Sequence, residues 1–298
     1  MKKTSKGHKT KTSLRTKSEK LLRAKKEDWV SLEAFKKLAI IFVITQTLGL
    51  IVATLLLAQG AQQPIFTENI NDVANSIYLI FMILAMTAVI LIVLRFRRKR
   101  NILWYIEALA VFTTTIVVAS AFFPTNDYIA LAIAILLVAW RYTHRNNLWL
   151  RNVVGIIAIV GAGALIGISL GLLPVFVFII ALSIYDLIAV FGTKHMVVIG
   201  RAVVKQNFAF TIALPTKHHT FELGNGDLVI PLMTASSVMA NGLFNSNYFV
   251  ASLLLSASFI GLMISIYLVA KKQFAMPALP PQTVLMVCVI IAAIFLGL

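Results

Sequence analysis

The chain has 298 residues, of which 59% are hydrophobic and only 13% are charged. This composition excludes an ordinary soluble domain, because repeated apolar stretches of about twenty residues are typical of transmembrane helices. The net charge of +16 would suit a nucleic-acid-binding protein, but its distribution along the chain excludes that class. The single cysteine, Cys288, lies in an apolar run, where we expect a buried thiol. We therefore expect an all-α multi-pass protein of the cell membrane, with the lipid bilayer and not nucleic acid as its partner.

The first 37 residues form a basic tail that carries thirteen of the 27 Lys and Arg residues. The tail lacks the short apolar core and small-residue cleavage site of a secretory signal. A solvated cytoplasmic tail that sets topology is the simpler interpretation. The alternative is a short amphipathic helix over 21–35 that lies on an anionic inner leaflet.

Nine apolar stretches follow the tail, and we expect each to be a transmembrane helix. They lie at roughly 38–59, 76–94, 102–123, 128–140, 153–172, 174–193, 226–243, 248–270 and 277–298. The remaining Lys and Arg residues fall in every second connection, at 95–100, 141–151, 194–217 and 271–272. Because positive loops stay in the cytoplasm, the N-terminus is expected in the cytoplasm and the C-terminus outside. The fifth stretch is rich in glycine, which lets helices approach closely, so we expect it in the centre of the bundle.

Two aspartates stand out against this apolar background. Asp186 lies deep in the sixth stretch, and Asp227 ends the motif Gly224–Asp227 at the head of the seventh. A carboxylate at membrane depth is costly and usually faces a cavity or a partner. At about 1.5 Å per residue, Asp186 lies roughly 18 Å from the outer end of its helix. The glycines before Asp227 tolerate unusual backbone angles, so their loop can dip to the same depth. Alone this motif is typical of a helix-capping turn; paired with Asp186 it predicts an acidic site.

Two further segments bear on this site. Three prolines within Pro277–Pro281 preclude regular helix and leave backbone groups unpaired, which a bilayer tolerates only beside protein or a water-filled cavity. We therefore place this segment near the aspartates; a plain kink at the membrane boundary is the alternative. In the loop 194–223, alternation of apolar residues from Phe208 to Leu214 predicts a half-buried strand.

Nothing in the sequence indicates a metal or a cofactor, and we expect neither. The chain contains no H-E-x-x-H motif. The pair His218-His219 has no acidic or thiol ligand close by, so a solvated polar turn is the better interpretation.

Together these motifs resemble a known family. Tyr185-Asp186, Gly224–Asp227 and Pro277–Pro280 resemble the three signatures of the presenilin and signal peptide peptidase family. Phe191-Gly192-Thr193 looks like signal peptide peptidase, whereas Pro277–Pro280 looks more like presenilin, and this mixture fits a microbial homologue. The likeness covers 174–298 well and the first five stretches only by general plan.

The resemblance implies a catalytic pair, Asp186 and Asp227, and a lining around it. The implied lining residues are Tyr185, Gly224, Asn225, Gly226, Pro277, Ala278 and Leu279. Asn225 departs from the family, because many relatives carry an apolar residue at this position, which is linked to substrate choice. The chain also lacks the long cleavable loop of presenilins, so activation by self-cleavage is not expected.

We therefore expect an intramembrane aspartyl endopeptidase that cuts transmembrane segments of membrane proteins or signal peptides. Its parts would be the basic tail 1–37, an N-terminal five-helix scaffold 38–172, and catalytic helices six to nine at 174–298 with the cytoplasmic loop 194–223. Two adjacent carboxyl groups cannot both ionise cheaply, so they share one proton and can act as acid and base on a water molecule.

Two other classes stay open at this point. A transporter or channel can also use intramembrane aspartates, but we see no internal repeat, and Glu107 is the one other acidic candidate. A non-catalytic scaffold leaves the aspartate pair unexplained. The sequence also leaves open whether the protein assembles as a homo-oligomer.

Overall fold

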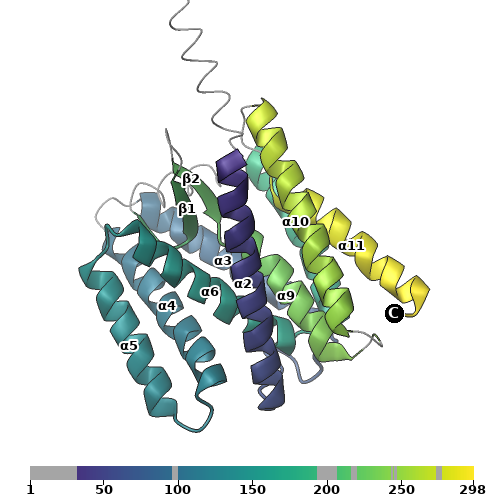
Figure 1. Ribbon diagram of the computed structural model, residues 1–298, viewed down its shortest axis with the longest axis horizontal. Helices are drawn as coiled ribbons and strands as arrows, with labels where there is room; N and C mark the ends of the chain where they lie inside the picture. Colours follow the sequence, from purple (N-terminus) through teal and green to yellow (C-terminus); the bar gives the residue numbers. More distant parts are fainter. Residues whose placement is uncertain are drawn as a thin grey trace, which may run out of the picture.

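The computed structural model describes residues 32–95, 100–192, 207–215, 220–242, 244, 247–272 and 277–298 (Figure 1). Within these residues it contains nine α-helices, one π-helical turn (η2) and one two-stranded sheet. The helices are α2 (Leu32–Ala58), α3 (Ala74–Arg95), α4 (Arg100–Phe122), α5 (Asp127–Thr143), α6 (Leu148–Ser169), α7 (Leu172–Leu187), α9 (Gly226–Asn241), α10 (Asn247–Lys272) and α11 (Leu279–Leu296). The other elements are η2 (Ile188–Gly192), β1 (Thr211–Pro215) and β2 (Thr220–Gly224).

Each of the nine predicted stretches overlaps one of these helices, so the expected all-α polytopic fold is confirmed. Seven of the described helices are long and apolar enough to cross a membrane, with α7 and η2 counted together as one span over Leu172–Gly192. The other two, α5 with 17 residues and α9 with 16, are shorter. Helix α2 begins at Leu32, six residues before the predicted first stretch, so the last residues of the predicted tail are helical. The rest of the predicted tail, including most of the alternative helix over 21–35, lies outside the described residues.

The outer surface of this bundle is apolar, as lipid contact requires. Large hydrophobic side chains are exposed on separate helices, including Phe81, Tyr128 and Phe295, which is 86% exposed. Cys288 is also exposed on α11, so the prediction of a buried thiol is wrong. The reason is that an apolar run in a membrane protein faces lipid on one side and protein on the other.

Helix α6 lies at the centre of the bundle, as its glycines predict. It packs against α2, α4 and α9 (Figure 1). A Cβ atom on Gly167 would lie 2.5 Å from the Met233 carbonyl oxygen of α9, and one on Gly161 would lie 2.5 Å from the Thr114 carbonyl oxygen of α4. Only glycine permits these backbones to approach so closely. Gly167 therefore allows α9 to pack directly against α6.

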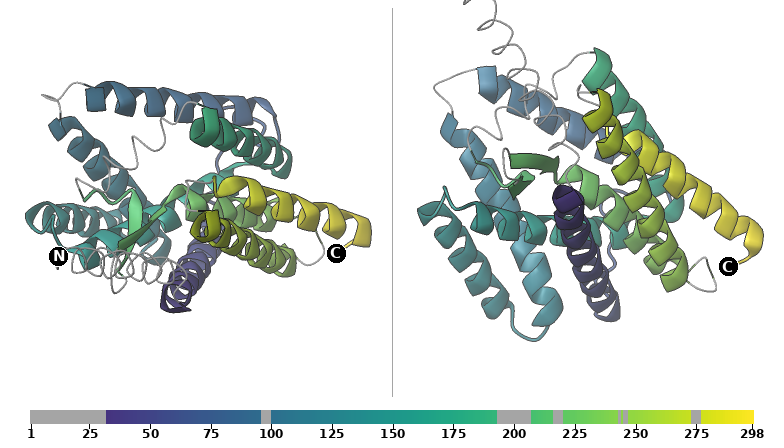
Figure 2. Two further views of the ribbon diagram at one scale, coloured as in Figure 1. Left: turned by 90° about the horizontal axis from the view of Figure 1, so that it is seen from above. Right: turned by 45° about the horizontal axis from the view of Figure 1, so that its top comes forward.

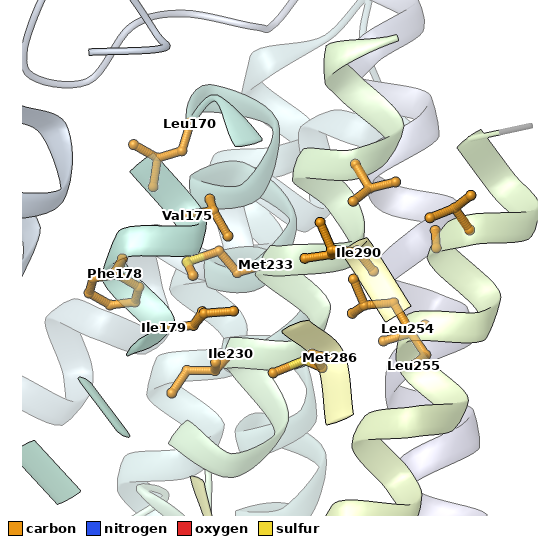
Figure 3. Close-up of a cluster of buried hydrophobic side chains, with 14 of the residues drawn as sticks. Leu170, Val175, Phe178, Ile179, Ile230, Met233, Leu254, Leu255, Met286 and Ile290 are labelled. Atoms are coloured by element: carbon orange, nitrogen blue, oxygen red, sulfur yellow. The ribbon is translucent and has the colours of Figure 1, made fainter. Parts of the chain in front are cut away.

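The largest apolar core joins α7, α9, α10 and α11. Figure 3 shows α7 side chains facing α9, with α10 and α11 side chains beyond them. On α7 the buried positions Val175, Ile179 and Leu182 are three or four residues apart and so share one face. Asp186 lies four residues after Leu182 and continues the same buried stripe. The face of α7 that packs on α9 therefore also carries the aspartate.

The two strands form an antiparallel hairpin at one end of the bundle (Figure 2). Their register pairs Thr211 with Gly224 and Pro215 with Thr220. The predicted strand is confirmed only in part, because β1 begins at Thr211 and Phe208 precedes it; β2 was not predicted. Apolar side chains of both strands join a core with α2, α6 and α9. The pair His218-His219 lies outside the described residues.

Candidate active site

Asp186 lies near the end of α7, with only 4% of its surface exposed. Its Oδ2 atom accepts a hydrogen bond of 3.3 Å from the backbone N–H of Leu279, at the start of α11. The α-helix ends one residue later and continues as η2. Such π-helical turns are rare and occur frequently at functional sites, because the extra residue re-aims the side chains around it.

Asp227 is the second residue of α9 and is partly exposed. It shares a helix face with Ile230, which packs in the core that α7 also lines. The charges of Asp227 and Asp186 are close enough to interact. Asn225, the N-cap residue, makes no side-chain capping bond. The structure thus brings the two predicted aspartates together from adjacent helices.

The two glycines of the motif leave room beside Asp227, and they do not adopt unusual backbone angles. Among the described glycines only Gly60, Gly242 and Gly297 have positive φ, so the predicted role of backbone angles at Gly224 and Gly226 is wrong. A Cβ atom on Gly224 would lie 3.4 Å from Oδ2 of Asp227, and one on Gly226 would meet no atom within 4 Å. Gly226 is also exposed. The backbone beside Asp227 is therefore open to another molecule.

The proline-rich segment contacts the site, but with more regular geometry than predicted. Pro277 is buried and precedes α11, whereas Pro280 and Pro281 form its first turn. The prediction that all three prolines preclude helix is wrong, because first-turn residues need no N–H and proline has the helical φ. Leu279 directly precedes these two prolines, and its backbone N–H donates a hydrogen bond to Asp186.

Of the remaining predicted lining residues, Ala278 lies beside the Asp186 contact, whereas Tyr185 and Asn225 make other contacts. Ala278 directly precedes Leu279, whose N–H bonds the Asp186 carboxyl, so it lies beside the site. Tyr185 is half-buried and packs against the core around α7. Asn225 instead bonds the segment before β1: its Nδ2 donates 2.8 Å to the Ala209 carbonyl, and its backbone N–H donates to the Phe210 carbonyl. In this structure Asn225 ties the start of α9 to the segment that precedes β1.

Sequence reasoning missed how the hairpin is attached to the N-terminal helices. The side chain of Asn152 on α6 occupies both backbone groups of Ala213, donating 2.7 Å to its carbonyl and accepting 2.8 Å from its N–H. Arg151, the neighbouring residue, donates to the Glu222 carboxylate of β2. A polar Arg-Asn pair at the start of a membrane helix was the available signal.

A second buried ion pair supports the segment before β1. Glu107 of α4 lies 3.0 Å from Arg141 of α5, and both side chains are almost fully buried. The same Glu107 oxygen accepts 3.1 Å from the Ala209 N–H. Glu107 is therefore a structural acid, which removes the one further acidic candidate for a transport site. Among the described residues no group of three His, Cys, Asp or Glu side chains gathers as metal ligands do.

Chemically, the site combines a buried carboxylate that accepts a backbone N–H bond, a second carboxylate near enough for the two charges to interact, and an open backbone beside the second. Such a pair can hold one proton between two oxygens and act on a bound water as base and acid.

Comparison with known proteins shows the family and the fold. The family model described as signal-peptide peptidase, presenilin aspartyl protease matches residues 39–223. The match includes Tyr185-Asp186 and most of the first five helices, a wider reach than the motifs alone predicted, and it ends just before Gly224–Asp227. The comparison with curated proteins returned no match.

Two solved structures of a presenilin family intramembrane aspartate protease share the fold. One, from crystals in space group C222, has a TM-score of 0.61 at 22% identity and covers 86% of this chain and 95% of that chain. The other, in space group P2, has a TM-score of 0.63 at 22% identity and covers 90% of this chain and 99% of that chain.

Proposed function

Because the chain belongs to the signal-peptide peptidase and presenilin family of aspartyl proteases, we propose that Asp186 and Asp227 are the catalytic pair of this membrane-embedded aspartic endopeptidase. One observation carries the proposal: three segments far apart in sequence meet at one point. Asp186 of α7 accepts the N–H of Leu279 from α11, and its charge interacts with Asp227 of α9. A cap or a packing residue needs no such convergence.

In the proposed reaction the pair shares one proton. The ionised carboxylate takes a proton from water as the water attacks the scissile carbonyl carbon, and the protonated carboxyl donates to the carbonyl oxygen. Collapse of the tetrahedral intermediate breaks the C–N bond, and a proton passes to the leaving amine. The two aspartates titrate as one unit, so the roles of acid and base belong to the pair.

We propose that the substrates are transmembrane segments of membrane proteins or signal peptides. A substrate helix must unwind near the aspartates, because a helical peptide bond is covered by its own hydrogen bonds and side chains. The backbone groups it frees need new partners at membrane depth. Strand addition to an open sheet edge supplies such partners.

The hairpin offers one suitable edge. Ala213 directs its N–H and carbonyl to Asn152, so the outer edge of β1 is occupied at that residue. Ala213 pairs with Glu222 across the sheet. Because backbone direction alternates along antiparallel strands, Glu222 and Gly224 then direct their backbone groups to the other edge, that of β2. This edge ends at Gly224, three residues before Asp227, which supports it as the site where the unwound substrate pairs.

The polarity of the bundle follows from the charge pattern. We propose a cytoplasmic N-terminus, an outer C-terminus, and a division into a scaffold over 38–172 and catalytic helices over 174–298. The hairpin and both aspartates then lie toward the cytoplasmic side, from which water reaches the site.

The test is cleavage of a synthetic transmembrane peptide by the purified chain in detergent micelles. The wild type should cut the peptide, and Asp186→Asn and Asp227→Asn should each abolish cutting. Asp127→Asn, which removes an exposed carboxylate from α5, is the matched control and should cut normally. Equal cutting by all four proteins would refute the proposal. Proton or cation flux in vesicles from a wild type that cuts nothing would favour a transporter.

A further inference from the structure

The first turn of α11 is where the backbone meets Asp186. The first N–H groups of a helix have no partner within it. In α11 two of these positions are Pro280 and Pro281, which have no N–H, and Leu279 directs its N–H to Asp186. Ala278, the N-cap residue, makes no side-chain capping bond. Whatever sets the position of this turn therefore sets the distance between the Leu279 N–H and the carboxylate.

Helix α10 touches this turn at backbone level, and the two helices lie side by side (Figure 2). A Cβ atom on Gly261 would lie 2.6 Å from the Gln282 Cα, 2.7 Å from its backbone nitrogen and 2.8 Å from the Pro281 carbonyl carbon. All three are backbone atoms, which cannot rotate away as a side chain can. Gly261 thus permits a separation of α10 and α11 that no other residue allows.

Two serines flank this contact on the same face of α10. Ser265 lies four residues after Gly261, and its hydroxyl is 3.1 Å from the Gly261 carbonyl oxygen and 3.3 Å from that of Ala278. Ser258 lies three residues before Gly261 and donates 2.8 Å to Oε1 of Gln282. Both serines are almost fully buried. Residues at these spacings share one helix face, so α10 holds the start of α11 at three successive points.

We propose that Gly261 and Ser265 are positioning residues for cleavage: they hold the first turn of α11 so that Leu279 bonds Asp186. This inference rests on the proposed function, and it assigns to α10 a part that none of the three sequence motifs includes. Ser265 acts through the Ala278 carbonyl, one residue before Leu279. Gly261 acts through the backbone of Pro281 and Gln282.

This role differs measurably from ordinary packing. A misplaced turn leaves the open edge of β2 untouched, so substrate binding should persist while the chemical step slows. Displacement of a catalytic contact by a fraction of an ångström to one ångström lowers the rate by about 10-fold to about 100-fold. A packing defect would instead lower the melting temperature of the whole bundle.

The experiment measures kcat, KM and melting temperature for the full chain in lipid vesicles with a synthetic transmembrane peptide. Ser265→Ala removes the hydroxyl, and Ser265→Thr keeps it. Ser256→Ala is the matched control, because its hydroxyl bonds only the Ser252 carbonyl on the exposed face of the same helix. We expect Ser265→Ala to lower kcat about 10-fold with KM and melting temperature unchanged, and Ser265→Thr and Ser256→Ala to stay within about twofold of the wild type.

Gly261→Ala should lower kcat further, by about 100-fold, and should also lower the melting temperature, because backbone atoms must move. Ser265→Ala is therefore the variant that separates positioning from packing. Three results would overturn the inference: an unchanged kcat in Ser265→Ala, a kcat loss that accompanies a lower melting temperature in that variant, or equal losses in Ser265→Ala and Ser265→Thr. A wild type that cuts nothing would mark the failure of the proposed function itself, and the inference would fall with it.

Discussion

Replacement of Asn152 by leucine should loosen the hairpin without changing the helices. Leucine keeps the branched shape of asparagine but removes the two bonds, of 2.7 Å and 2.8 Å, that join α6 to Ala213. Each such bond contributes about 1 kcal/mol net, so the loss is about 2 kcal/mol. A factor of ten corresponds to about 1.4 kcal/mol, so the opened hairpin should become about 30-fold more populated.

The assay is hydrogen–deuterium exchange, followed by mass spectrometry of peptides that cover β1 and β2. In Asn152→Leu the hairpin amides should exchange about 30-fold faster, while amides of α9 keep the wild-type rate. Asn126→Leu is the matched control, because Asn126 caps α5 without a side-chain bond. Unchanged hairpin exchange in Asn152→Leu would show that Asn152 does not hold β1, and would remove the reason for assigning the free edge to β2.

Three further predictions concern two glycines and the shared proton. Gly167→Ala should destabilise the bundle by about 2 kcal/mol, because its Cβ would meet the Met233 carbonyl at 2.5 Å; an unchanged melting temperature would contradict the close α6–α9 contact. Gly226→Ala should leave the melting temperature unchanged, because its Cβ meets no atom within 4 Å, but should raise KM by crowding the substrate; normal KM would place the substrate elsewhere. The cleavage rate should fall at both acid and alkaline pH, because a doubly protonated pair lacks a base and a doubly ionised pair lacks an acid; a rate that rises steadily across the range would exclude a one-proton pair.

The helices and the aspartate pair were predictable from the sequence because each has a strong local cause. Membrane-length apolar runs define the helices. An acidic side chain at membrane depth is so costly that Asp186 and Asp227 stand out in the sequence as a candidate pair. The close packing of α6 follows in the same way from Gly161 and Gly167, which leave room for backbone contact.

The attachments between elements were not predictable, because they depend on which distant residues meet. The alternation of Phe221 and Leu223 with polar neighbours was a signal for β2, but it is only a few residues long. The Asn152–Ala213 clamp joins residues 61 positions apart and has no local pattern. The first turn of α11 was not predictable for the same reason. Its prolines predict irregular backbone, whereas in the structure Pro280 and Pro281 are ordinary first-turn residues of a helix whose first N–H bonds Asp186.

A double-mutant comparison of cleavage rates tests most directly whether Asp186 and Asp227 act as one unit. Rates of peptide cleavage would be measured for Asp186→Asn, Asp227→Asn and the protein that carries both changes. If the pair shares one proton and one water, either single change should lower the rate as far as the double change does. Losses that multiply in the double variant, or a single variant that keeps most of the wild-type rate, would contradict the shared site.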